Sequence, residues 1–501
     1  MPVFIGALDL TVVSAVLPQV VYDLQIPLRG GMDQAAWVVS GYLLAYTIAM
    51  TFMGRLSDLW GRRRIYLLSL TVFAAGSLLV AVADGQPARW LALGYRLLLQ
   101  RHPDPAQMAL WALIAGRMVQ AFGGGAMVPV SMALAGDLYP PLRRAAPLGF
   151  IGAVDTAGWV VGHLYGGIVV RYASWRMIFW LNLPICLLAF VLAAWALRRL
   201  PAPRAEGKFD GLGAALAAAA LAALTLGLGQ SATEPGGTAF SAQAPPEISW
   251  PLLGVAAGCL AVFVALELRQ RYPLVPVRLF GNRNFSAAAV VNFLAGFSLV
   301  IAIANVPLFI NTLVAATLQQ GAWDSGWMLS GLTLPMAAAA LLGGWATPRV
   351  GYRATAGLGL VLAMAGFALM AGWRAATPYS VMLGHLALAG VGLGLVIAPV
   401  ATAVVNAAAP EQRGAASALV IIFRLCGMTL GLAAMTTYDL RRADALLNGM
   451  ATADLARLAA AGMDAMNRVI NETFWLAALV CALALVPALL LGADHSRSTL
   501  S

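Results

Sequence analysis

The strongest constraint on this chain is a series of fourteen long apolar segments. A bilayer core of about 30 Å is crossed by about 20 apolar residues in helical form. Only 10% of the residues are charged and 61% are hydrophobic, whereas a soluble domain carries about 25% charged residues. The sequence therefore predicts an all-α polytopic membrane protein. The predicted spans are 3–22, 33–53, 65–83, 107–136, 146–170, 176–197, 211–230, 250–268, 285–311, 325–346, 354–373, 379–405, 415–437 and 472–492.

The positions of the basic residues predict how these spans are oriented. The net charge of +10 comes almost entirely from arginines in the loops between spans, and not from the basic clusters that bind nucleic acid. With both termini inside, eighteen Arg and Lys side chains fall in inner loops and eleven in outer segments. Because cytoplasmic loops carry the excess of basic residues, we expect both termini to be cytoplasmic, in a multi-pass protein of the inner or plasma membrane.

An internal repeat organises the chain. Pro129, Pro140 and Arg143 recur as the same residue types 270 positions later. Gly54 and Gly61 recur 290 positions later, and the difference matches an extra segment between the two groups. The sequence therefore predicts two parallel repeats of six spans, as in transporters whose halves rock about a central site.

The repeat predicts three parts. Residues 1–200 form the first six-helix half, 201–270 a linker with two extra transmembrane helices, and 271–501 the second six-helix half. The linker helices are almost purely apolar, so we expect lipid-facing connectors. Residues 84–107 alternate bulky apolar and basic side chains, which suits a helix in the outer interface. Residues 438–471 lack proline, so they are expected to continue the last two spans as helices beyond the membrane. Such an extension would suit a lipid substrate, as a ramp from the outer leaflet. A bent loop there would remove this indication.

Four motifs occur in order along the first half. They are LDLTVVSAVLP (8–18), GRLSDLWGRRR (54–64), RMVQAFGGGAMVP (117–129) and GFIGAVDTAGWVVGHLYGG (149–167). In these motifs the chain resembles the fourteen-span drug:proton antiporters of the major facilitator superfamily over nearly its whole length. The stretches GVGLGLVIAP and RLCGMTLGLAA are most similar to mycobacterial exporters of triacylglycerides and drugs. The resemblance implies the major facilitator fold, with 14 transmembrane helices, and alternating access driven by protons.

The second motif predicts a conformational latch on the cytoplasmic side. Asp58 can face helix ends, while Arg62 and Arg63 can meet carboxylates or carbonyls of neighbouring spans. The alternative is a plain positive-inside loop. Such a loop would need the arginines, but neither Asp58 nor the paired glycines Gly54 and Gly61.

The fourth motif places an acid on a glycine stripe. Glycines at every fourth position let two helices approach closely, and a helical wheel puts Asp155 on the same face. His163 stands where the antiporter signature has proline, either as a satisfied interior histidine or as part of a proton relay. The resemblance implies that the stripe packs tightly against the second half and prevents leak. Its glycines are Gly149, Gly158, Gly162, Gly166 and Gly167.

Ionisable groups within spans are candidates for proton coupling, because a charge in hydrocarbon costs at least ~2.5 kcal/mol. We predict this role for Asp9, Arg117, Asp155 and Arg424. The repeat places Asp155 and Arg424 at nearly matching depths in the two halves, so they form either a coupling pair or a static ion pair. Arg117 could take part in proton transfer, as the resemblance implies, or simply pair with Asp9. Lipid-exporting relatives carry a carboxylate one residue after Asp155, where this chain has Thr156.

Several function classes lack their motifs in this sequence. There is no GxxxxGK[ST] loop for nucleotide hydrolysis and no Cys/His spacing typical of a metal site. The favoured function is a proton-coupled secondary exporter of lipophilic or amphipathic compounds, of multidrug type. It would need no cofactor beyond the proton gradient.

Alternatives within and outside transport remain open at this level. A triacylglyceride-like lipid is the alternative substrate, since two acids in the spans are balanced by two arginines and leave no extra carboxylate for a cationic drug. More distant alternatives are a non-transporting membrane receptor and a membrane transferase. The expected partners are the substrate, membrane lipids and, for a lipid, an extracytoplasmic carrier protein; we expect a monomer and no nucleic acid.

Overall fold

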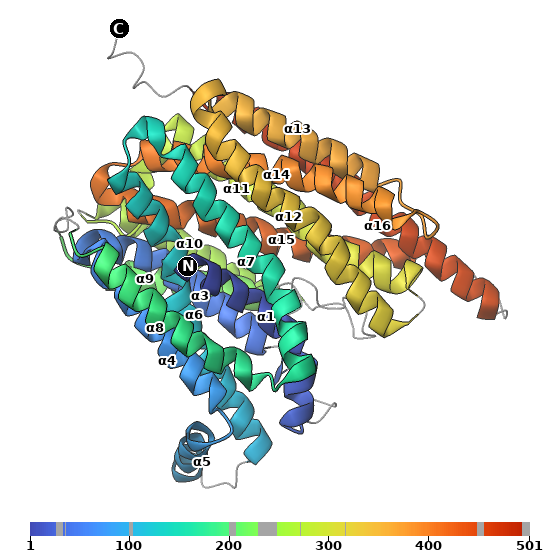
Figure 1. Cartoon of the computed structure of the whole chain (residues 1–501), viewed down its shortest axis with the longest axis horizontal. Helices are drawn as coiled ribbons and strands as arrows, with labels where there is room; N and C mark the ends of the chain where they lie inside the picture. The colour runs from blue at the N-terminus through green and yellow to red at the C-terminus, as the bar shows by residue number, and fades with distance from the viewer. Residues whose placement is uncertain are drawn as a thin grey trace.

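The fold is built from helices that contain the apolar segments, and several helices extend beyond them. The computed structural model describes residues 1–26, 34–35, 37–99, 104–199, 207–228, 248–270, 272–315, 317–447 and 455–492. Within these ranges the regular structure is helical, without strands (Figure 1).

The helices fall into three groups along the chain. The first group is α1 (Pro2–Asp23), α3 (Trp37–Trp60), α4 (Arg62–Ala81), α5 (Gln86–Leu99), α6 (Pro105–Leu138), α7 (Ala145–Tyr172) and α8 (Arg176–Ala196), with η1 (Pro141–Arg143) between α6 and α7. The linker holds α9 (Gly211–Gly227) and α10 (Trp250–Arg269). The last group is η3 (Val277–Gly281), α11 (Arg283–Phe309), η4 (Ile310–Val314), α12 (Leu318–Val350), α13 (Tyr352–Met370), α14 (Tyr379–Ala407), η5 (Pro410–Gln412), α15 (Arg413–Leu447) and α16 (Leu455–Leu490).

Every predicted span overlaps one of these helices. Among the described residues, eleven helices are long and apolar enough to cross a bilayer, and two shorter apolar helices cover Pro2–Val13 and Gly211–Gly227. The all-α membrane fold is thereby confirmed. The number of helices that cross the membrane stays a prediction, as does the division at residues 200 and 270.

Helix packing joins the first and last groups along two interfaces. Within the first group, α4 packs on α6 and α8, α3 on α6, and α1 on α7; in the last group, α14 packs on α12 and α13, and α11 on α15 and α16. Between the groups, α7 packs on α12 and α3 on α15. In Figure 1, α5 and the tip of α16 lie at separate corners of the molecule.

The internal repeat is visible in the structure as two matching contacts. A Cβ on Gly54 of α3 would lie 2.4 Å from the carbonyl oxygen of Gly414, and a Cβ on Gly344 of α12 would lie 2.8 Å from that of Ala145. Both glycines therefore let helices of opposite halves touch through their backbones. Gly61 and Gly351, also related by the repeat, have φ of 96° and 89°, which favours glycine. The two halves thus use repeated residues at equivalent places.

The extension 438–471 is helical, as predicted, in the part that the structure describes, 438–447 and 455–471. α15 continues to Leu447 and α16 begins at Leu455. The two helices are tied together by Glu472 of α16, which accepts hydrogen bonds from Arg442 Nε at 2.9 Å and from Tyr438 Oη at 2.7 Å. Within the predicted segment 84–107, residues 86–99 form helix α5, and its location in the interface stays a prediction.

The linker helix α9 differs from the expected lipid-facing connector. Ala217 is only 6% exposed within the core, and Phe209 makes an edge-on contact with Phe52 of α3, with 6.2 Å between ring centroids. Leu212, by contrast, is 60% exposed. The prediction therefore describes one face of α9 and is wrong for the other.

Candidate functional site

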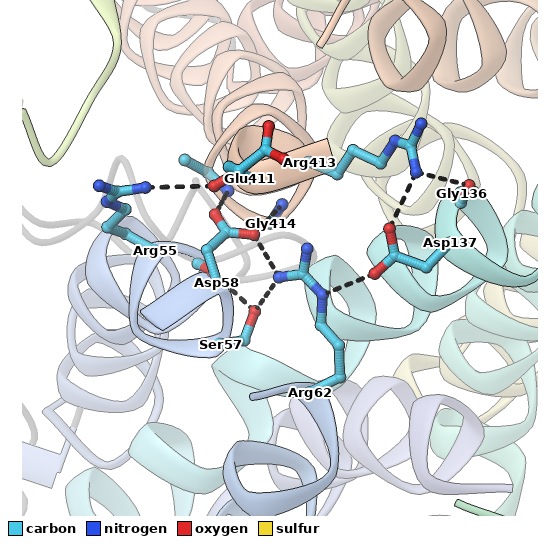
Figure 2. Close-up of polar contacts among 11 residues, drawn as sticks. Arg55, Ser57, Asp58, Arg62, Gly136, Asp137, Glu411, Arg413 and Gly414 are labelled. Carbon is cyan, nitrogen blue, oxygen red and sulfur yellow. Dashed lines mark hydrogen bonds and ion pairs between the residues drawn. The ribbon is translucent and has the colours of Figure 1, made fainter. Parts of the chain in front are cut away.

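Asp58 links the end of α3 to the start of α15. Its Oδ1 and Oδ2 accept hydrogen bonds from the backbone N–H groups of Gly414 and Ala415, at 3.0 and 3.1 Å (Figure 2). These N–H groups belong to the first turn of α15, where they have no partner within the helix and favour a negative charge. Asp58 is 4% exposed and forms an ion pair with Arg62, whose Nη1 also donates to Ser57 at 2.7 Å. The acid thus binds the second half while an arginine of the first half holds it in place.

A second acid completes this cluster. Asp137, at the end of α6, lies between two arginines in Figure 2. Arg62 Nε donates to its Oδ2 at 3.1 Å, and Arg413 Nη1 donates to its Oδ1 at 2.9 Å and to the carbonyl of Gly136 at 2.9 Å. Because Arg413 begins α15, this chain of ion pairs crosses from one half to the other. We call the cluster of Asp58, Arg62, Asp137 and Arg413 the latch.

The other arginines of the motif lie at the edge of the latch. Arg55 Nη1 donates to the carbonyl of Glu411 at 3.2 Å, which adds a third contact between the halves. Arg63 instead makes a long hydrogen bond of 3.4 Å to the carbonyl of Ala194 in the first half. The predicted contacts of Asp58, Arg62 and Arg63 are therefore present in the structure, and the bonds of both arginines lie within the first half.

Gly54 allows the latch to close, so substituting it should open the latch. In Gly54→Ala, the added Cβ cannot fit against the Gly414 backbone, and α3 and α15 must separate. We expect faster hydrogen exchange of the Gly414 and Ala415 amides, measured by mass spectrometry of the purified protein. Gly357→Ala on α13 is the control, because a Cβ there meets nothing within 4 Å. Unchanged exchange in Gly54→Ala would show that the contact does not hold the latch.

A separate ion pair joins the halves between α7 and α15. Arg424 Nη2 of α15 lies 3.0 Å from Asp155 Oδ2 of α7. The side chain of Asp155 is 7% exposed and that of Arg424 15% exposed. The pairing expected from the repeat is thus observed. A contact of this length is common to a coupling pair and a static ion pair.

The acid of α1 lies in a buried polar cluster inside the first half. Arg117 Nη1 lies 2.5 Å from Asp9 Oδ2, and Gln120 Nε2 and Asn182 Nδ2 donate to Asp9 Oδ1 at 2.9 and 3.2 Å. Gln120 also donates to Ser77 at 2.8 Å. All of these residues are at most 2% exposed. The structure therefore shows the simple pairing of Arg117 with Asp9 that the sequence left as one of two alternatives.

These two ion pairs respond differently to a movement of the halves. The contacts of Asp9 come from α6 and α8, and Gln120 of α6 also bonds Ser77 of α4; all of these helices belong to the same half as α1. A rigid rotation of one half against the other leaves such contacts intact. Asp155 and Arg424 belong to opposite halves, so the same rotation changes their distance.

The glycine stripe of α7 is shared between two neighbours, contrary to the single contact expected. A Cβ on Gly149 would lie 2.6 Å from the carbonyl of Ala340 in the second half. On Gly158 and Gly162 it would lie 2.8 and 2.5 Å from carbonyls of α1, in the same half. The expectation of a stripe facing the second half is therefore wrong for these two glycines. A helical wheel gives the direction of a residue but not the neighbour that occupies it.

Three further residues predicted for the site lie on α7. Gly166 is buried. The predictions for His163 and Gly167 concern side-chain surroundings that lie outside the described part of the structure.

Sequence reasoning missed three acids with a defined place in the structure. Asp137 is a member of the latch, although it lies one residue past the predicted span. Glu267 of α10 is 3% exposed and accepts from the N–H of Val275 at 3.0 Å; it falls inside a predicted span and was detectable there. Asp439 of α15 is 4% exposed, and its Oδ1 has no hydrogen-bond partner among the described residues. It was missed because α15 runs past the predicted end of the span.

Comparisons with known proteins agree with this architecture. The Major Facilitator Superfamily profile matches residues 3–313. The chain is 31% identical to a probable triacylglyceride transporter of Mycobacterium leprae (strain TN), over 99% of this chain and 96% of that protein. It is 32% identical to a triacylglyceride transporter of Mycolicibacterium hassiacum, over 88% of this chain and 78% of that protein.

Solved structures share the fold at low sequence identity. The proton:xylose symporter XylE gives a TM-score of 0.59 at 13% identity, over 97% of this chain and 93% of that one. The human organic anion transporter MFSD10 gives 0.55 at 16% identity, over 96% and 98% of the two chains. The chain therefore belongs to the major facilitator superfamily and is a membrane transporter, not an enzyme.

Proposed function

We propose that this protein is a proton-coupled exporter of a lipid with long hydrocarbon chains, similar to a triacylglyceride. The observation that carries the proposal is the buried Asp155–Arg424 pair, which joins opposite halves at a hydrogen-bonding distance of 3.0 Å. An acid that loses and regains its cation as the halves rock changes its affinity for protons in step with the movement. Such a pair can couple proton flow to alternating access without any further cofactor.

The latch would serve as the closed gate on one side. Because it sits on the side of the membrane where the arginine-rich motif of α3 and α4 lies, we assign that side to the cytoplasm. With the latch closed, Asp58 and Asp137 hold the first turn of α15 against the first half. The Asp9–Arg117 cluster would keep the first half rigid during the movement and is, in this proposal, a supporting site.

The lipid substrate is supported by relatives and by the space between the halves. The curated relatives named above are triacylglyceride transporters by name. A cavity with about 720 Å³ of space free of atoms, including its open part, lies between helices of both halves, and its described lining holds no charged side chain. A cationic drug of the kind moved by multidrug exporters would lack a carboxylate partner in this lining, so we place multidrug export second. The outer extension of α15 and α16 suits a path for a lipid beyond the membrane.

Proton movement that depends on the lipid is the direct test. The full chain is reconstituted in proteoliposomes with an imposed pH gradient, with and without a triacylglyceride in the vesicles. We expect dissipation of the gradient, followed with a trapped pH dye, to accelerate only when both the protein and the triacylglyceride are present. A cationic dye tested in the same way distinguishes the two substrate classes. If neither compound changes the gradient, proton-coupled export of this kind is excluded.

A further inference from the structure

The linker helix α9 supplies part of the wall of the cavity between the halves. The cavity is lined by residues of α1, α3, α7, α11 and α15, together with Leu221, Leu224 and Thr225 of α9. With the buried Ala217, Leu221 and Leu224 stand at i, i+4 and i+7, which is one face of a helix. Leu226, on the opposite face, is 36% exposed. A helix outside the two six-helix groups therefore contributes to the interior space of the protein.

The place of α9 is beside the interface between the halves. It packs on α3, and the cavity extends from α9 past Leu44 of α3 to Met428 and Leu432 of α15. Since α3 and α15 come from opposite halves, α9 covers the side of their interface. A hydrocarbon chain in the cavity is separated from the surrounding lipid by α9 on this side.

Two of the three threonines in the lining have their hydroxyls bonded within their own helices. The hydroxyl of Thr47 donates to the carbonyl of Leu43 at 2.8 Å, and that of Thr429 donates to the carbonyl of Leu425 at 3.0 Å. These threonines satisfy their hydroxyls within their own helices, while the leucines offer only hydrocarbon. A polar headgroup placed here would lose its hydrogen bonds to water without replacement, whereas a hydrocarbon chain would not.

Two residues of the cavity lining are close in sequence to the ion pair that joins the halves. Trp159 lines the cavity one helical turn after Asp155, and Leu425 follows directly after Arg424. A chain that occupies this space therefore lies beside the groups whose separation accompanies the movement.

We propose that α9 forms the outer wall of a binding site for a hydrocarbon chain of the substrate. The Leu221–Leu224 face of α9 limits how bulky this chain can be. The inference rests on the proposed lipid substrate and adds to it a location and a residue that determines specificity. It also gives the linker a role in binding, beyond connecting the halves.

Photolabelling tests this site. The full chain in lipid nanodiscs is irradiated with a triacylglyceride analogue that carries a diazirine near the end of one chain, and labelled peptides are identified by mass spectrometry. We expect labels on α9 near residues 221–225 and on α15 near residues 426–432. Leu224→Trp fills the space, and losing the burial of about two methylene groups lowers labelling about tenfold. Leu226→Trp makes the same substitution on the exposed face and should label like the unmodified protein.

A second variant guards against misfolding in Leu224→Trp. Leu224→Ala enlarges the cavity, so it should keep the labels and accept an analogue with a branched chain end that the unmodified protein labels poorly. Labels confined to exposed positions such as Leu212, or full labelling of Leu224→Trp, would overturn the inference. The proton assay is independent: lipid-dependent proton movement without labels on α9 refutes only the site, and labels without such movement refute only the coupling.

Discussion

Asp155→Asn is expected to abolish lipid-dependent proton movement in proteoliposomes. The substitution keeps the size of the side chain and its ability to accept a hydrogen bond from Arg424, but removes the group that binds and releases a proton. Asp155 is buried and pairs with a cation of the opposite half, Arg424, whose neighbour Leu425 lines the cavity. Loss of coupling should therefore be complete, while binding of the lipid analogue to the cavity persists.

A surface acid provides the control for this prediction. Asp84 Oδ2 lies 2.7 Å from Arg176 Nη2, but the side chain of Asp84 is 48% exposed. Exposed pairs of this kind contribute little, so Asp84→Asn should transport like the unmodified protein. Photolabelling of Asp155→Asn separates a coupling defect from a folding defect, since a misfolded protein would lose the labels too. Proton movement that continues in a correctly folded Asp155→Asn would assign coupling to another group.

Asp9→Leu or Arg117→Met alone is expected to destabilise the protein strongly. The side chains of both residues are at most 1% exposed, so removing one leaves a buried charge without its partner. Breaking a buried ion pair in this way typically costs about 3–5 kcal/mol. The measurement is thermal unfolding of the purified protein in detergent, where both single variants should unfold at lower temperature than the unmodified chain.

The double variant Asp9→Leu/Arg117→Met decides whether the charge itself causes the loss. Apolar side chains of similar volume remove both charges together, which is often neutral or stabilising. We expect the double variant to recover most of the lost stability, with a residual cost from the amides of Gln120 and Asn182, which lose their acceptor. A double variant as unstable as the sum of the singles would mean that packing, and not charge pairing, holds this cluster.

Sequence alone predicted those features that depend on position along a helix. The spans follow from apolar length, and the pairing of Asp155 with Arg424 follows from the register of the repeat, because equivalent residues lie at equivalent depths. The latch was predicted from Asp58 and Arg62, but its second acid, Asp137, was not. Asp137 is brought there by the end of α6, and nothing in its local sequence marks the two arginines that it meets.

Features that depend on which helices are neighbours could not be predicted. The stripe of Gly158 and Gly162 gives no indication of whether α1 or a helix of the second half lies against it. The sequence of α9 is apolar on all sides, so no contrast between polar and apolar residues reveals the face that meets the cavity. In a membrane, lipid and protein interior are equally apolar, and hydrophobic patterning loses the information that it carries in water.

The duplicated halves are unequal in one respect that bears on how the transporter is switched. Gly54 and Gly344 make equivalent contacts, but the position that matches Asp58 is Pro348, and Arg143, which matches Arg413, is exposed. At the second contact an amide takes the place of a carboxylate: Arg144 Nη1 donates to Asn406 Oδ1 at 2.6 Å across the halves, and Asn406 Nδ2 donates to Tyr352 Oη at 2.8 Å. The first contact therefore depends on carboxylate charge and the second does not, so removing the charge of Asp58 or Asp137 should shift the balance between the two orientations of the protein.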